Sequence, residues 1–156
     1  MPEDGFHPTL SASNSVSNGA SARPLRHIRA ADCTDSTAQT GGMQRFAAIS
    51  GATVGSESLW MGRTHVCPDT RSVNHHHGES ETAIYVAKGH PVFVFHDGEQ
   101  EVTLRTEPGD YVFVPPFAPH REENPSPDEE AVVIIARSTQ EAIVVNLPSL
   151  RPESTD

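Results

Sequence analysis

Three consecutive histidines, His75, His76 and His77, are the strongest chemical signal in the sequence. If this segment is a strand, alternate side chains share a face, so His75 and His77 point one way and His76 points the other. Two imidazoles on one face can bind one metal ion, because histidine is largely neutral at pH 7 and neutral imidazole is a metal ligand. The alternative is a solvated turn that is rich in histidine by chance.

A fourth histidine, His120, follows a predicted strand and a bend made by two adjacent prolines. Glu122 lies two residues later on the same predicted strand, and therefore on the same face. An imidazole and a carboxylate placed in this way could reach the ion that His75 and His77 would bind. The chemistry indicated by these residues is that of a divalent metal site.

Short apolar or alternating runs separated by turn residues must position these side chains. They fill the chain from about residue 43 to 147, and none has a convincing helical period. Strands are predicted at 44–50, 58–67, 72–77, 82–88, 91–96, 100–106, 111–115, 118–123, 131–137 and 141–146. Many short strands at this spacing favour a β-sandwich or barrel, and a jelly roll is the closed arrangement that suits them.

The two histidine segments resemble the paired motifs of the cupin superfamily, G-x5-H-x-H-x(3,4)-E-x6-G and G-x5-P-x-G-x2-H-x3-N. The residues that echo these motifs are His75, His77, Glu81, Gly89, Gly109, Pro115, His120 and Asn124. The resemblance covers about residues 58–146. It implies an all-β fold, a single cupin jelly-roll β-barrel, with a flexible N-terminal arm. It also implies one divalent transition metal per chain.

Two turns and one spacing depart from the cupin pattern. Asp69 and Phe117 stand where the motifs have glycine, so we expect those turns to be built differently. Glu81 is followed by seven residues before Gly89, where the pattern has six, and this count places Thr82 in the carboxylate register. Because a slip of one residue reverses the face of a strand, Glu81 binds the metal only if a bulge intervenes.

Glu122 is the other candidate carboxylate. The pirin branch of the cupins has similar H-x-H-x3-E-T and H-x-E patterns, and this likeness implies His75, His77, His120 and Glu122 as ligands, with Glu81 as a rival ligand. Three imidazoles and one carboxylate leave two octahedral positions open and suit Fe, Mn, Ni or Zn. Whichever of Glu81 and Glu122 does not bind the metal is the candidate general base.

Four further residues are candidates for the substrate pocket: Trp60, Arg63, Tyr85 and Phe117. Trp60 and Arg63 lie on the strand before the first motif, where cupins often line the pocket. Arg63 would hold an anionic substrate, and Phe117 would present its ring to the pocket mouth. Packing in the core or exposure on the surface is the alternative for each of them.

Composition restricts the partners and the location. The chain has 156 residues with 21 acidic and 11 basic side chains, a formal net charge of −10 that opposes binding to nucleic acid or anionic membranes. No apolar run approaches the roughly 20 residues of a membrane span, and the first residues do not resemble a secretory signal. We expect a cytoplasmic protein with a small-molecule ligand or substrate, no nucleic acid and no membrane.

The domain organisation follows from the same patterns. Residues 1–42 are expected to form a disordered or extended N-terminal arm, 43–147 the barrel and 148–156 a flexible tail. Cupins commonly pair through an outer strand, so a homodimer is expected. The expected function is that of a metal-dependent enzyme acting on a small oxygen-bearing organic molecule, most simply by a dioxygenase-like oxidation. A metal-dependent isomerase or lyase, or a non-catalytic sensor or binding protein, is the alternative.

Overall fold

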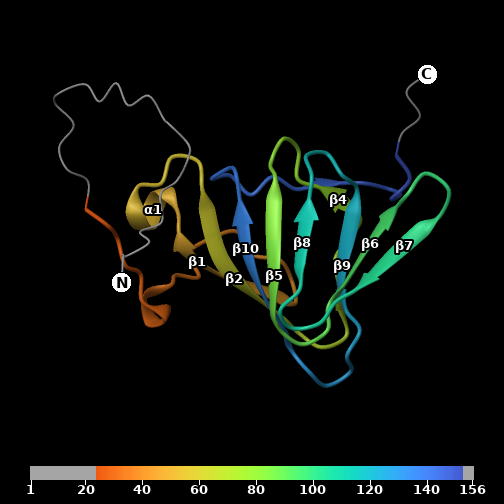
Figure 1. Ribbon diagram of the computed structural model, residues 1–156, viewed down its shortest axis with the longest axis horizontal. Coiled ribbons are helices and arrows are strands. Elements are labelled where there is room, and N and C mark those ends of the chain that lie inside the picture. Colours follow the sequence, from red (N-terminus) through yellow and green to blue (C-terminus); the bar gives the residue numbers. More distant parts are fainter. Residues whose placement is uncertain (1–23, 153–156) are drawn as a thin grey trace, which may run out of the picture.

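The computed structural model describes residues 24–152, and its regular structure is almost entirely β-strand (Figure 1). The first sheet, in spatial order, contains β1 (Met43–Ile49), β2 (Trp60–Val66), β10 (Ala131–Arg137), β5 (Thr82–Lys88) and β8 (Tyr111–Val114). The second sheet, in spatial order, contains β11 (Val145–Asn146), β4 (His75–His76), β9 (His120–Asn124), β6 (Val92–His96) and β7 (Glu101–Arg105). The short β3 (Thr70–Arg71) pairs with β9.

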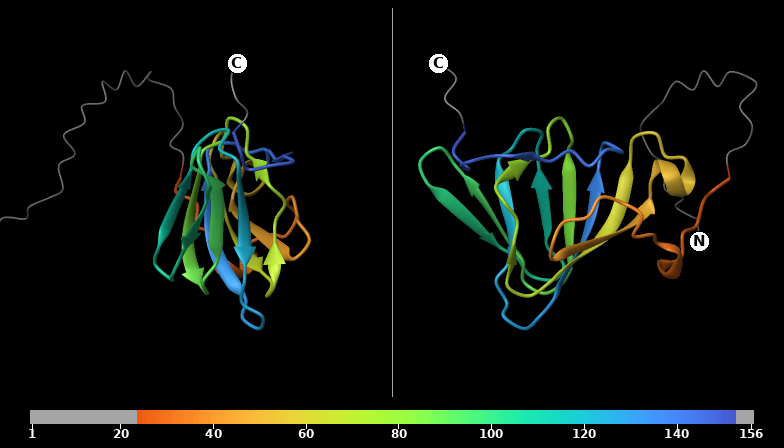
Figure 2. Two further views of the ribbon diagram at one scale, coloured as in Figure 1. Left: turned by 90° about the vertical axis from the view of Figure 1, so that its right-hand side faces the viewer. Right: turned by 180° about the vertical axis from the view of Figure 1, so that it is seen from behind.

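The two sheets face each other and enclose the interior of a jelly-roll barrel (Figure 2). Every strand pairing is antiparallel. The predicted all-β class and the jelly-roll architecture are therefore confirmed. Each predicted strand overlaps an observed one, and among residues 24–152 the sequence prediction missed only β3 and two single turns of helix, η1 (Ala30–Asp32) and α1 (Gly51–Val54).

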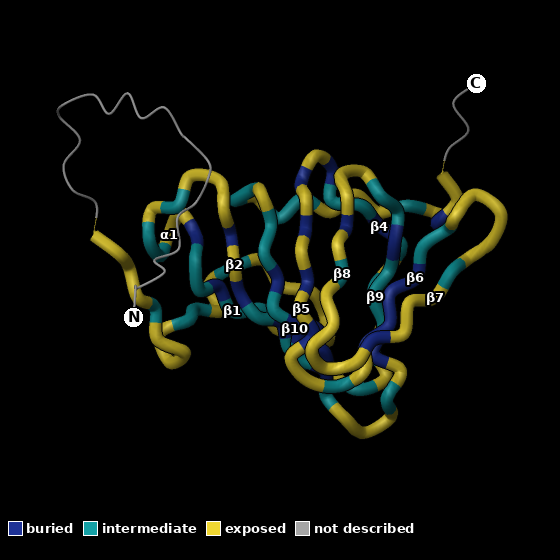
Figure 3. Tube along the Cα trace, in the orientation of Figure 1, coloured by how far each residue is buried: buried dark blue, intermediate teal, exposed yellow. Residues whose placement is uncertain are grey.

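Side-chain alternation decides what faces the interior. Along β5 the buried residues are Thr82, Ile84 and Val86, while the residues between them are exposed (Figure 3). The main apolar cluster contains Ala47, Trp60, Ile84, Val86, Phe93, Val114, Val133 and Ile135. Burial of each large apolar side chain contributes about 1.5–3 kcal/mol. This cluster fills one part of the barrel and leaves the other part to the polar residues described below.

The structure also describes residues on both sides of the predicted barrel limits of 43–147. Thr34 forms an isolated bridge with Ala47, and Thr40 forms another with Met43, so part of the predicted arm packs along the first sheet. At the other end Leu150, within the predicted tail, is 2% exposed, while Pro148 and Ser149 before it are exposed. The predicted disorder of residues 1–23 and the last four residues of the tail, 153–156, lie outside the described residues.

The two turns without glycine keep a left-handed backbone. Asp69 has φ 51° and Phe117 has φ 60°. This is the region that glycine enters without cost and that a bulky side chain enters with strain. The expectation that these turns are built differently is therefore wrong for the backbone, which keeps the conformation that a glycine would favour.

Across residues 24–152, no helix combines the length and apolar character needed to cross a membrane. The cytoplasmic location stays a prediction.

Candidate metal centre

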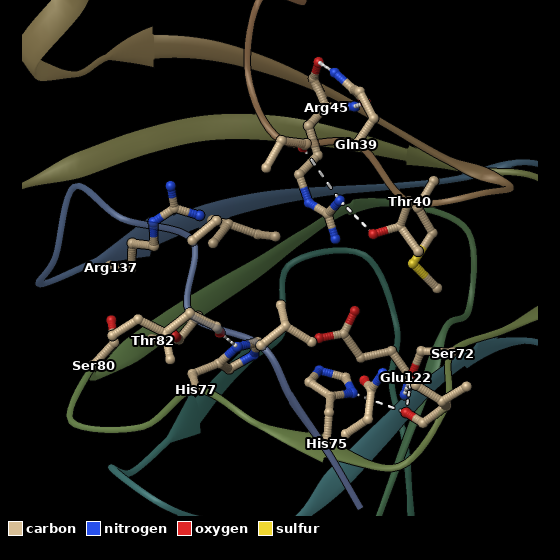
Figure 4. A pocket seen from close by; sticks show the side chains of 18 of the residues that line it. Gln39, Thr40, Arg45, Ser72, His75, His77, Ser80, Thr82, Glu122 and Arg137 are labelled. Atoms are coloured by element: carbon tan, nitrogen blue, oxygen red, sulfur yellow. Dashed lines mark hydrogen bonds between the residues drawn. The ribbon is translucent and has the colours of Figure 1, made fainter.

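Four side chains meet at one end of the barrel interior. His75 lies on β4, His77 follows that strand directly, and His120 and Glu122 lie on β9. One ligand atom from each of these residues lies within 4.8 Å of the others. Figure 4 shows His75, His77 and Glu122 directed at the same space. The structure thus brings together the set that the sequence predicted from the pirin likeness.

Backbone carbonyl groups orient all three imidazoles. The Nδ1 atom of each ring lies at hydrogen-bonding distance from one carbonyl oxygen: Val73 for His75 (2.8 Å), Ile143 for His77 (2.9 Å) and Ala118 for His120 (2.9 Å). Because a carbonyl oxygen only accepts, each Nδ1 must carry the proton, and in the neutral ring Nε2 then has a free lone pair. Such outer contacts fix the tautomer and orientation of histidine ligands at metal sites.

A buried lone pair without a partner supports the presence of an ion. The Nε2 atom of His120 is buried and makes no hydrogen bond, and the nearest Glu122 oxygen lies 3.6 Å away. Leaving a buried polar atom unpaired costs free energy, which a metal ion between these groups would recover. Three imidazole nitrogens and one carboxylate oxygen also form a donor set that divalent transition metals prefer. The residues present therefore fit a divalent metal.

The protonation states suit the same conclusion. Burial alone would raise the pKa of Glu122, but His120 and the other two imidazoles lower it to about 2. Burial lowers the pKa of His77 to about 4 and also lowers the pKa of His75. Burial would lower the pKa of His120 as well, but Glu122 beside it raises that pKa above its ordinary value. At neutral pH the site thus holds an ionised carboxylate and two firmly neutral imidazoles.

Glu81 lies outside this cluster. Its side chain is exposed on the outer face, while Thr82 is 4% exposed and lines the interior. The first sheet does contain a register shift, where Val133 pairs with Val86 and Val132 pairs with Lys88. That irregularity lies at the far end of β5 and leaves the alternation at Thr82 unchanged. The structure therefore does not bring Glu81, the predicted rival ligand or base, to the cluster.

A cavity of about 350 Å³ adjoins the cluster. Its polar lining includes Gln39, Thr40, Arg45, Ser72, Thr82 and Arg137 (Figure 4). Its apolar lining includes Met43, Val73, Ile135, Ala142, Ile143 and Val144. A volume near this size is at the small end of ligand pockets. The cavity can therefore accept a small organic molecule that contacts His75, His77 and Glu122.

Two arginines of the first sheet contribute to this cavity. The guanidinium of Arg137 lies over the Trp60 ring at 4.1 Å and donates to the carbonyl oxygens of Thr139 and Gln140 at 3.1 and 3.0 Å. Burial, together with a smaller effect of the nearby Arg45, lowers the pKa of Arg137 to about 10. Burial also lowers the pKa of Arg45, although Glu122 opposes this. Both side chains stay positively charged at neutral pH.

The predicted pocket residues lie elsewhere. Trp60 is 3% exposed in the apolar core, and Arg63 lies over the Phe46 ring at 4.8 Å on the outer face. Tyr85 stacks against Tyr111 on the outer face of β5 and β8, with ring centroids 5.0 Å apart.

Phe117, the fourth predicted pocket residue, is 60% exposed, and its ring centroid lies 5.7 Å from that of His76. None of these four lines the cavity, so the structure does not bring the expected pocket set to the metal cluster. Strand alternation is the reason for the first three, because Trp60 points into the packed core while Arg63 and Tyr85 point outward.

Arg45 lines the cavity although the sequence did not predict it as a pocket residue. It lies between Met43 and Ala47, which are both buried, so the alternation of that strand directs it inward. The alternation of this strand can be seen in the sequence, but a charged side chain in an inward position is uncommon, so Arg45 was not predicted to line the pocket.

Comparison with known proteins agrees with this geometry. Residues 62–136 match the family model described as the Cupin domain. The polyketide cyclase RemF from Streptomyces resistomycificus superposes with a TM-score of 0.64 and 19% identity, over 80% of this chain and 86% of that one. Peruvianin-I, a cysteine peptidase from Thevetia peruviana latex, superposes with a TM-score of 0.59 and 15% identity, over 73% of this chain and 72% of that one. The chain therefore contains a cupin domain, which confirms the family that the paired motifs predicted.

A further similar structure is that of Bacillus subtilis oxalate decarboxylase, which is described as having Mn(II) centres. It gives a TM-score of 0.59 and 21% identity over 70% of this chain, which spans only 29% of that chain. No curated protein matches the sequence. At these identities the solved structures support the fold alone, and the finer likeness to pirin stays a prediction.

Proposed function

We propose that this protein is a metal-dependent cupin enzyme that acts on a small oxygen-bearing organic molecule, with dioxygenase-like oxidation as the reaction. The observation that carries the proposal is the convergence of His75, His77, His120 and Glu122, with ligand atoms within 4.8 Å of one another, at the wall of a 350 Å³ cavity. A substrate in that cavity would lie directly against the metal ligands.

The metal supplies the electrophile and, if it is iron or manganese, the redox centre. Iron, manganese, nickel and zinc all suit the donor set. The manganese of the similar oxalate decarboxylase supports a divalent ion of this group. The chain's own contribution is to hold three imidazoles by backbone carbonyls, so that their orientation is set before substrate binds.

The cavity has little acid–base chemistry of its own. Apart from the metal ligands, the described residues that line it include no carboxylate, histidine, lysine, tyrosine or cysteine. Glu122 is expected to bind the metal, and Glu81 lies outside, so neither serves as a separate base within the cavity. Insertion of both atoms of dioxygen into a substrate needs no external reductant and no net proton transfer. An isomerase or lyase would need a proton carrier, so this site favours oxidation.

The same lack of a base also suits a non-catalytic binding or sensor protein, which is the second candidate. Dioxygen consumption separates the two functions. Protein purified without an affinity tag would be analysed for metal, loaded with Fe(II) or Mn(II), and tested with catechols, 1,3-diketones and 2-oxo acids in an oxygen electrode.

We expect near-stoichiometric metal and uptake of one dioxygen per substrate consumed, with both lost in His77→Ala. Bound metal without uptake on any substrate class would favour the binding protein. A wild-type chain that takes up no metal would overturn both metal-dependent functions.

A homodimer is part of the proposal. β8 is the edge strand of the first sheet, and its outward residues Tyr111 and Phe113 are 79% and 61% exposed. Unpaired strand edges and exposed aromatic residues are features that a second copy can cover. Multi-angle light scattering should give twice the chain mass, and a monomeric mass would contradict this expectation.

A further inference from the structure

One half-buried cation, Arg45, faces the metal cluster from the opposite wall of the cavity. Arg45 extends inward from β1, and its Nη1 atom donates to the hydroxyl of Thr40 at 2.8 Å and to the carbonyl oxygen of Ala38 at 3.5 Å (Figure 4). Its Nε and Nη2 atoms have no hydrogen-bond partner among the described residues. The guanidinium is thus held by one of its nitrogen atoms and presents the others to the cavity.

Arg45 also lacks a counter-ion in the described part of the chain. No carboxylate oxygen there lies within 4.0 Å of its guanidinium, whereas the exposed Arg71 and the half-buried Arg121 do have such partners. The one carboxylate that lines the cavity is Glu122, which belongs to the metal cluster. An unpaired cation in a partly buried position is costly, so a bound anion would stabilise this arrangement.

The charge of the cavity points in the same direction. A divalent ion with three neutral imidazoles and Glu122 would carry a net charge of about +1. Arg45 and Arg137 both line the same space and add to that positive charge. The chain as a whole has a formal net charge of −10, so the cavity is a positive site within an acidic protein. Such a site attracts anions through its positive electrostatic potential as well as through direct contacts.

Arg137 has a different role from Arg45. Its Nε and Nη2 atoms already donate to backbone carbonyls, and its face is covered by Trp60. It therefore forms part of the wall, while Arg45 keeps unused donors. A planar guanidinium with free donors is suited to a carboxylate, which it can bind through two parallel hydrogen bonds.

We propose that the substrate is a small organic dianion, such as a dicarboxylate, with one oxygen group against the metal cluster and a second carboxylate bound by Arg45. Arg45 is then the residue that determines specificity, and Thr40 positions it. This inference rests on the proposed metal site and names the substrate class for it.

The test measures binding, so it does not depend on turnover. Protein loaded with Zn(II), which has no redox chemistry, is titrated calorimetrically with malonate, succinate and glutarate. Each is compared with the monocarboxylate of equal carbon number: propionate, butyrate and valerate. For the best-fitting length we expect the dicarboxylate to bind about 10- to 100-fold more tightly, the range for a charge-assisted hydrogen bond in a partly buried site.

Arg45→Gln should reduce this preference to about threefold or less while the metal content stays unchanged. The matched control is Arg63→Gln, which removes the same charge from the outer face of the neighbouring strand and should keep the full preference. Equal binding of both ligand types to the wild type would overturn the inference. So would a preference that survives Arg45→Gln or that Arg63→Gln also removes.

A second variant covers the case in which Arg45→Gln does not fold. Thr40→Val keeps the charge of Arg45 but removes its 2.8 Å hydrogen bond, and it should lower the preference by about 3- to 10-fold. An unchanged preference in Thr40→Val would then count against the inference.

The outcome can be told apart from that of the proposed function. An Arg45-dependent preference without oxygen uptake on any substrate would support the anion site and contradict the dioxygenase. Oxidation of a neutral substrate, with no preference for dicarboxylates, would support the dioxygenase and contradict the anion site. If the protein takes up no metal, the same titration of the metal-free chain, with Arg45→Gln as comparison, still decides whether Arg45 binds carboxylates.

Discussion

His75 and His120 lie directly opposite each other in the register of β4 and β9, with ring centroids 4.5 Å apart. Each is 5% exposed, and each is held through Nδ1 by a carbonyl of the residue two positions earlier in its own segment. Side chains opposed across antiparallel strands have Cβ atoms about 4.5–5.5 Å apart, so two imidazoles on one such pair meet without backbone strain. The strand pairing itself therefore creates half of the metal site.

The role of the histidines as metal ligands can be tested by substitution, with the adjacent His76 as the control. Replacement of His77 or His120 by alanine removes an Nε2 donor and should lower metal content by at least about tenfold at micromolar free metal. His76→Ala is the matched control, because His76 accepts a hydrogen bond from the Gly78 amide at Nδ1 and does not belong to the cluster. Elemental analysis of the three purified variants measures the effect. Loss of metal in His76→Ala as well would show that the histidine run binds the ion in another way.

A pair of substitutions tests which carboxylate, that of Glu122 or that of Glu81, binds the metal. Glu122→Gln keeps the size of the side chain but removes the charge, and we expect metal affinity to fall by about 10- to 100-fold. Glu81→Gln changes an exposed side chain and should leave the affinity within about twofold. Competition with a chelator of known affinity gives both values. A larger effect at Glu81 would contradict the register that places Thr82 inside the barrel.

Metal affinity should fall as the pH is lowered. Protons compete with a metal for imidazole, so affinity falls tenfold per pH unit for each ligand that is protonated in the free protein. Burial lowers the pKa of His77 to about 4 and also lowers the pKa of His75, whereas Glu122 raises the pKa of His120. Between pH 5 and 6 His77 is therefore neutral in the free protein, while His120 carries a proton that the metal must displace.

The logarithm of the affinity should therefore rise by no more than about two per pH unit across that range, because His77 has no proton to release. Three ordinary histidines would give a slope approaching three, since their pKa lies near 6.5. Zinc titrations at several pH values, in buffers that do not bind zinc, measure the slope. A slope approaching three would contradict the neutral state of His77, and a slope of zero would contradict the protonated state of His120.

Most of the fold could be predicted from the sequence, because it depends on local patterns such as the alternation along β5. The grouping of His75, His77, His120 and Glu122 was predicted from the likeness to the cupin and pirin motifs, since strand period alone does not bring two distant segments together. The lining of the cavity could not be read in this way. It depends on which face of each strand turns inward and on contacts between segments far apart in the chain, such as His77 with Ile143.

Arg63 and Arg45 illustrate the difference. Both are arginines on adjacent strands, and in the register Arg63 pairs with Phe46, the residue after Arg45. This offset of one residue puts one guanidinium on the outer face and the other in the cavity. The sequence prediction chose Arg63 because it lies on the strand before the first motif, where cupins often line the pocket, and because a cation there would hold an anionic substrate. The buried neighbours of Arg45, Met43 and Ala47, indicate the opposite choice once their faces are known.

The left-handed backbone at Phe117 should make glycine the more stable residue at this position. Phe117 has φ 60°, which costs a residue with a Cβ about 1–2 kcal/mol, and its exposed ring recovers little by burial. We expect Phe117→Gly to exceed Phe117→Ala in free energy of unfolding by about 1 kcal/mol, since only glycine relieves the strain. Ala83→Gly is the control: Ala83 lies within the extended β5, where glycine should cost roughly 0.5–1 kcal/mol. Urea denaturation of the metal-free variants measures these differences, and a more stable alanine variant at position 117 would show that the turn relaxes out of the left-handed region.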